Sequence, residues 1–139
     1  MVVKPRKKTP QKRTRRYGTV GGGLVTKTTG EGPYVVEYPL YDSTGQFKKT
    51  KMPGSQSSSN RGWVTQNSAK RFKTLRGAIG FFERRIHGGG QAELYLWKNR
   101  NAFGKRSVDN VDYRRIFSNK TVVTDEEIER AIRKKIGAV

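Results

Sequence analysis

The chain has 139 residues, no cysteine and a formal net charge of +19, from 30 lysines and arginines against 11 acidic residues. The absence of cysteine excludes disulfides and thiolate metal sites, and no apolar run reaches the roughly 20 residues that span a bilayer. The hydrophobic fraction of 32% is low for a chain that is all core, which indicates one domain with a segment outside it.

The first predicted element is a basic arm over residues 1–17. Its stretch Lys4–Arg16 reads KPRKKTPQKRTRR and contains no acidic residue. Two prolines oppose a helix, and like charges without apolar partners cannot offset the entropy lost on ordering. We therefore expect the arm to be disordered when free, followed by a single α+β domain over residues 18–139.

A β-hairpin is predicted next. Pro33–Tyr41 is rich in aromatic and β-branched residues, Asp42–Gly45 has the composition of a tight turn, and Gln46–Met52 is the expected returning strand. Residues 53–62 form a polar loop in this interpretation, and an extended segment restarts at Trp63.

A first amphipathic helix is predicted over Leu75–His87, with Thr74 as its N-cap. Apolar residues recur there at three- and four-residue spacing, which places them on one face; they are Leu75, Ala78, Ile79, Phe82 and Ile86. Three glycines at 88–90 end this helix.

A second hairpin is expected from Gln91–Lys98 to about Val108. Alternation turns one set of side chains to each side of the first strand: Ala92, Leu94 and Leu96 on one, Glu93, Tyr95 and Trp97 on the other. Residues 111–123 give no clear signal.

The last helix follows a capping box formed by Thr124 and Glu127. Its apolar stripe consists of Ile128, Ala131, Ile132 and Ile136. The predicted fold is thus a small antiparallel sheet of β-hairpins packed by two amphipathic helices. A weak duplication of one unit, over residues 34–86 and 92–136, is a further hypothesis.

Positive charge is the strongest functional signal, because a strongly basic chain attracts polyanions. In the arm the candidate nucleic-acid-binding residues are Lys4, Arg6, Lys7, Lys8, Lys12, Arg13, Arg15 and Arg16. In the folded part they are Lys48, Lys49, Lys51, Lys70, Arg71, Lys73 and Arg76. The alternatives are a solubility tail or localisation signal for the arm, and a solvated outer face for the others.

Aromatic residues are interleaved with the basic ones, a pattern typical of proteins that stack unpaired bases. The expected stacking residues are Tyr95 and Trp97, on the strand side opposite Ala92, Leu94 and Leu96. Core packing is the alternative fate of such rings.

One architectural resemblance concerns residues 34–85. An aromatic strand, an Asp-x-x-Gly turn, a basic strand and then Arg71–Thr74 leading into a helix with Ala78 and Phe82 resemble the three-stranded DNA-binding domains of plant AP2 factors and of recombinase arm-binding modules. That resemblance implies a sheet laid in the major groove. The serine-rich stretch 53–62 departs from the pattern.

Catalytic chemistry has little support in the sequence, so we expect neither an enzyme nor a cofactor. His87, at the end of the predicted helix, is the single histidine, and one histidine without any cysteine excludes the usual zinc ligand sets. Asp109 and Asp112 resemble turn formers more than a metal-binding carboxylate pair. Glycines 21–23 lack the lysine of a phosphate-binding loop.

We therefore expect an intracellular, non-secreted protein that binds DNA or RNA electrostatically, without a membrane partner. One alternative is a structural component of a larger nucleoprotein assembly or oligomer, such as a viral coat or core or a ribosome-type particle. A second is a phage-type inhibitor of a nucleoprotein complex.

Overall fold

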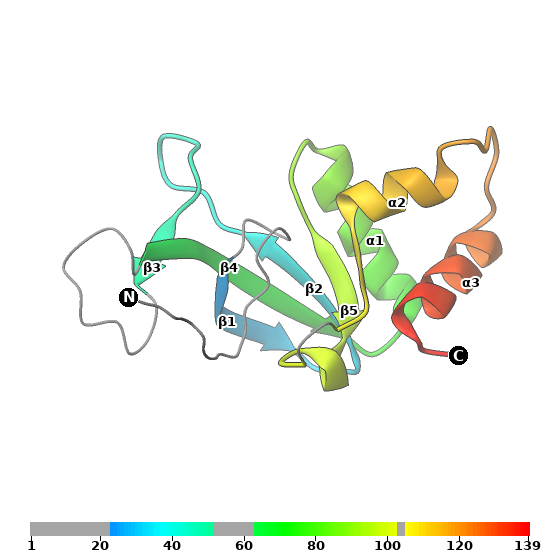
Figure 1. The fold of residues 1–139 in the computed structure, drawn as a ribbon, viewed down its shortest axis with the longest axis horizontal. Helices are drawn as coiled ribbons and strands as arrows, with labels where there is room; N and C mark the ends of the chain where they lie inside the picture. The colour runs from blue at the N-terminus through cyan, green and yellow to red at the C-terminus, as the bar shows by residue number, and fades with distance from the viewer. Residues whose placement is uncertain (1–22, 52–62, 103–104) are drawn as a thin grey trace, which may run out of the picture.

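The computed structural model describes residues 23–51, 63–102 and 105–139, to which all structural statements below refer (Figure 1). The predicted basic arm, residues 1–17, lies outside the described residues, as does the predicted polar loop at 53–62.

Six strands and three α-helices make up the described part, which confirms the predicted α+β class. The strands are β1 (Leu24–Gly30), β2 (Tyr34–Pro39), β3 (Lys49–Lys51), β4 (Trp63–Phe72), β5 (Glu93–Leu96) and β6 (Ser107–Asp109). The helices are α1 (Leu75–His87), α2 (Asn110–Phe117) and α3 (Asp125–Ile136), with a short 3-10 helix η4 (Trp97–Asn99).

The strands form one mixed sheet in the order β1-β4-β2-β5-β6, with β3 paired to β4 beyond the end of β2. Strand β1 runs parallel to β4, whereas the other pairs are antiparallel. The expectation of a purely antiparallel sheet is therefore wrong. Strand β1 falls in a region for which no strand was predicted, because its burial and polarity do not alternate cleanly.

The first predicted hairpin closes only at its tip. Tyr41 and Phe47 form an isolated bridge around the turn, and the returning strand β3 then pairs with β4 instead of β2. Strand β4 has ten residues and β2 has six, so β4 continues past β2 and offers its backbone to β3. In the turn, hydrogen bonds from the Thr44 side chain and nearby backbone amides lower the pKa of the Asp42 carboxyl, which keeps the turn acceptor ionised.

All three helices contribute to a core on one face of the sheet. Every residue of the stripe predicted for α1 is buried, and this stripe packs on Val36, Leu94 and Leu96 from the sheet. Helix α3 adds Ile132 and Ile136 to the same cluster. Helix α2 occupies part of the segment that gave no sequence signal.

Helix α2 docks on α1 through Tyr113. Its ring meets Phe82 edge-on at 5.4 Å between centroids, and its hydroxyl donates a hydrogen bond to Glu83. Burial, and then this carboxylate, raise the pKa of Tyr113 well above its ordinary value. The phenol therefore remains protonated and keeps donating at any physiological pH.

The opposite face of the sheet carries a buried polar network. The Tyr95 hydroxyl donates to Glu37 Oε1 at 2.8 Å, and Asn67 Nδ2 donates to Glu37 Oε2 at 2.7 Å. Glu93 lies directly across from Glu37 on β5, and Lys105 Nζ approaches Glu93 Oε1 at 3.6 Å and the Tyr95 ring centroid at 3.9 Å. Because facing like charges repel, the ammonium group of Lys105 stabilises this carboxylate pair.

Replacing Tyr95 with phenylalanine keeps the ring and removes one donor to the buried Glu37 carboxylate. We expect Y95F to lower the free energy of unfolding by about 1–3 kcal/mol, measured by urea denaturation. The control is Y41F, at a residue that is 42% exposed, and its stability should change by less than about 0.5 kcal/mol. Equal effects of the two substitutions would contradict a structural role for the network.

Candidate nucleic-acid interface

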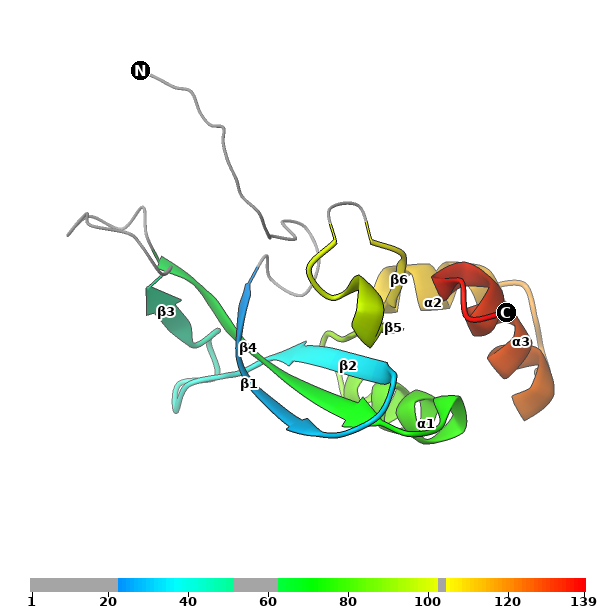
Figure 2. The same cartoon turned by 90° about the horizontal axis from the view of Figure 1, so that it is seen from below.

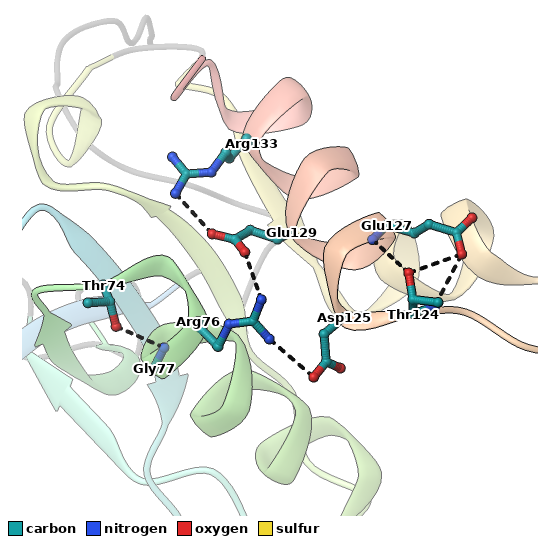
Figure 3. Close-up of polar contacts among 8 residues, drawn as sticks. All are labelled: Thr74, Arg76, Gly77, Thr124, Asp125, Glu127, Glu129 and Arg133. Atoms are coloured by element: carbon teal, nitrogen blue, oxygen red, sulfur yellow. Dashed lines mark hydrogen bonds and ion pairs between the residues drawn. The ribbon is translucent and has the colours of Figure 1, made fainter.

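Carboxylates and cations are distributed unevenly over the molecule. Within the described residues, the ion pairs gather on the helices and on the segment leading into β6, as in the chain from Arg133 through Glu129 and Arg76 to Asp125 (Figure 3). From β1 to the end of α1, eight described cations make no ion pair with any described residue: Lys27, Lys48, Lys49, Lys70, Arg71, Lys73, Arg84 and Arg85. These eight, the unpaired cations, are the candidates for the interface, and they occupy both faces of the sheet, since Lys70 and Arg71 are consecutive in β4.

Strand β4 and helix α1 bring three of the unpaired cations onto aromatic rings. We call this group the cation–aromatic cluster; it consists of Tyr38, Lys70, Phe72, Phe81, Arg84 and Arg85. Lys70 and Phe72 alternate along β4 and so share a face. Lys70 Nζ lies 5.5 Å from the Phe72 centroid and 5.1 Å from that of Phe81.

The two arginines of the cluster come from the last turn of α1. Arg84 Cζ lies 5.9 Å from the Phe81 centroid, and Arg85 Cζ lies 4.2 Å from the Tyr38 centroid. Phe81 in turn packs against both Tyr38 and Phe72, each at 5.5 Å. Arg85 Nε is buried and has no hydrogen-bond partner among the described residues, so the ring beneath it is the main contact that holds this guanidinium.

A cation over a ring keeps its charge, whereas a cation in an ion pair is neutralised. Such contacts contribute about 0.5–1 kcal/mol at exposed sites and hold a long side chain in place. The cluster therefore presents positive charge in a restricted geometry, which suits a polyanion.

The three lysines predicted on the returning strand lie on or beside β3. Lys48 and Lys49 are exposed and Lys51 is half-buried. By register, Lys49 lies opposite Thr65 and Lys51 opposite Trp63. These lysines are placed at the end of the sheet that points away from α2 and α3 (Figures 1 and 2).

The remaining predicted cations are divided between the interface and the fold. Lys73 is exposed just before α1. Arg71 donates from Nε to the Gly32 carbonyl at 2.9 Å, and its Cζ lies 3.9 Å from the Trp97 centroid. Arg76 bridges α1 to α3 through Asp125 and Glu129 at 3.1 and 3.2 Å, so its charge is largely compensated.

The predicted stacking pair is not available as expected. Tyr95 is 0% exposed within the polar network, so a base cannot reach its ring and we remove it from the interface. Trp97 is partly buried, and Arg71 and Arg100 lie over its ring at 3.9 and 5.0 Å. Alternation along the strand shows which way a ring points, but the sequence does not show whether that side of the sheet is covered.

Sequence reasoning missed Phe81, the residue that joins the cation–aromatic cluster. Its signal was present, since Arg84 and Arg85 follow it at the spacing that places helical side chains side by side. Phe81 lies outside the buried stripe of α1, so the periodicity of that stripe does not reveal this second contact surface. The arm candidates, Lys4 to Arg16, lie outside the described residues.

Asp109, Asp112 and His87 each make contacts within the fold, and the His87 ring meets Tyr113 edge-on at 6.3 Å. Asp109 accepts the backbone amide of Asp112 at 2.7 Å and so caps α2, and Asp112 pairs with Arg115 and Lys135. His87 is exposed at the end of α1. The parts of the chain that the structure describes contain no group of three or more potential metal-ligating residues. Nor, among the same residues, is any helix long and apolar enough to cross a membrane.

No known family model, curated protein or solved structure matches this chain. The resemblance expected for residues 34–85 also differs from the observed pairing. Strands β2 and β3 each pair with β4 and not as a regular ladder with each other, while β1 and β5 extend the same sheet. That segment is therefore not a self-contained three-stranded unit, and part of the sheet face it would present is buried.

Lys73 and Arg76 offer a matched test of the interface, since each substitution to glutamine removes one positive charge. We expect K73Q to elute from heparin at lower salt than the unmodified protein, because Lys73 has no carboxylate partner among the described residues. R76Q should elute nearly unchanged, because its charge is already compensated by two acids. A larger shift for R76Q than for K73Q would place the polyanion on the helical side.

Proposed function

We propose that this protein is a non-enzymatic nucleic-acid-binding protein whose folded interface consists of the unpaired cations of the strands and α1. The observation that carries the proposal is the segregation of charge, with these cations free of carboxylates while most acids are engaged elsewhere. Cations that have no carboxylate partner among the described residues keep their charge available for phosphates.

Phosphate binding by such a surface is driven by the release of condensed counterions. Each neutralised phosphate contributes about 0.9 to the slope of log K against log salt for duplex DNA, and about 0.7 for single strands. The cations of the cation–aromatic cluster are already restrained by rings, so they lose less side-chain entropy on binding than free lysines do. The arm, with eight further cations, is proposed to add affinity without sequence preference.

The test compares two triple variants of the full chain that lose the same charge. K70Q/R84Q/R85Q removes the cations of the cluster. R114Q/R130Q/K134Q removes three exposed cations of α2 and α3 that make no ion pair with described residues. Fluorescence anisotropy with labelled duplex DNA, single-stranded DNA and duplex RNA is recorded over a salt series.

We expect the cluster variant to bind more weakly and to lower the magnitude of the salt slope by about 2–3, as three lost phosphate contacts require. The matched variant should change the slope by less than about 1. Thermal unfolding of both proteins, and the single variant R84Q at an exposed position, separate lost contacts from lost folding. Equal slopes for the two triple variants would overturn the assigned interface, and salt-independent binding would overturn the proposed function.

A further inference from the structure

Trp63 is a large aromatic residue that lies outside the hydrophobic cores formed by the described residues. It is the first residue of β4, it is 46% exposed, and it belongs to neither hydrophobic cluster of the described residues. Tryptophan normally brings a large apolar area into a core or an interface. Its exposure here indicates a role outside the packing of the chain.

The register of β3 against β4 places two lysines near Trp63. Lys51 lies directly opposite Trp63, and Lys49 lies two residues further along the same strand. Directly opposed residues share a face of the sheet, and so do residues two apart on one strand. Lys49, Lys51 and Trp63 therefore lie on one face of the two-stranded ribbon that β3 forms with the start of β4, which we call the basic ribbon.

The basic ribbon is placed where a ligand can approach it. Both views show β3 and the start of β4 at one end of the molecule and helices α2 and α3 at the other (Figures 1 and 2). The only other tryptophan, Trp97, is partly buried with two guanidinium groups over its ring. No such cation–ring contact is found for Trp63 among the described residues.

We infer that Trp63 stacks on an unpaired base while Lys49 and Lys51 contact the adjoining phosphates, which makes single-stranded nucleic acid the preferred ligand. This inference rests on the proposed function and specifies its ligand. In a duplex both faces of each base are covered by neighbours, so a ring can stack only after a base has been unpaired. A single strand offers base faces and phosphates together, which is the pairing of groups the basic ribbon complements.

The experiment uses tryptophan fluorescence, because the chain contains only two tryptophans. The variant W97F carries Trp63 as its only tryptophan, and W63F carries only Trp97. We expect the emission of W97F to be quenched on addition of oligo(dT) or oligo(rU), and to change little with duplex DNA at the same occupancy. The emission of W63F should stay nearly constant with all three ligands.

Affinity provides a second readout in the unmodified background. We expect W63T, which keeps a residue suited to a strand, to bind oligo(dT) or oligo(rU) about 5- to 150-fold more weakly. Its affinity for duplex should change by less than about twofold. W63Y retains a ring and should recover most of the loss, and thermal unfolding of each variant shows whether the ribbon remains folded.

The outcomes separate this inference from the proposed function. If W63T binds single strands as tightly as the unmodified protein, and Trp63 emission does not respond, stacking is excluded while salt-dependent binding can still stand. If W63T lowers the affinity for single strands and for duplex equally, stacking is excluded and Trp63 belongs to a surface that binds phosphates in general. If the intact protein binds none of the ligands at low salt, both the proposed function and the inference fail.

Discussion

The backbone hydrogen bonding of β4 along both of its edges is the constraint on which the molecule depends. Strand β1 pairs with one edge of β4, while β2 and then β3 share the other. Because side chains alternate along a strand, β4 also distributes its residues between two environments. It delivers Lys70 and Phe72 toward α1, and Asn67 and Ala69 to the buried opposite face. One strand thus builds the sheet and carries much of the candidate interface.

The small number of acids determines which cations are available. Nine of the 11 acidic residues form ion pairs or hydrogen bonds with described residues. They cap helices, close a turn, join α1 to α3 and build the network around Glu37. A strongly basic domain must still limit its own repulsion, and here aromatic rings take the place of carboxylates beside Lys70, Arg84 and Arg85. Rings stabilise these cations without cancelling the charge that a polyanion would need.

Local signals in the sequence predicted the parts of the fold that depend on local interactions. Helices α1 and α3 begin close to the expected residues, because Thr74, Thr124 and Glu127 cap their N-termini through neighbours in the chain. The strand pairing could not be read in the same way, since β1 meets β4 about 40 residues away. The lengths of β2 and β4 determine that β3 pairs with β4, and this pairing cannot be predicted from residues 46–52 alone.

The sequence predicted which charged residues belong to the candidate site, but not which groups lie beside each of them. Lys70, Arg71 and Lys73 were identified from composition, and which of them has a carboxylate or a ring beside it depends on distant segments. Tyr95 and Trp63 show that the exposure of an aromatic residue in a strand cannot be predicted from its position in the sequence. Both are aromatic residues of strands, yet Tyr95 is enclosed by Glu37 and Lys105, whereas Trp63 lies on a ribbon that extends beyond the layers of the sheet.

The parallel pairing of β1 with β4 has a consequence for how the chain enters the fold. Gly23 packs so closely on β4 that a β-carbon there would lie 2.4 Å from the Thr65 carbonyl oxygen, two residues from Trp63. Gly23, the first described residue of the chain, therefore lies beside the start of β4, close to the basic ribbon. Under the proposed function, a nucleic acid bound to the ribbon would meet the covalently linked cations of the predicted arm at a raised effective concentration. Two weak contacts joined in this way can act as one bivalent attachment.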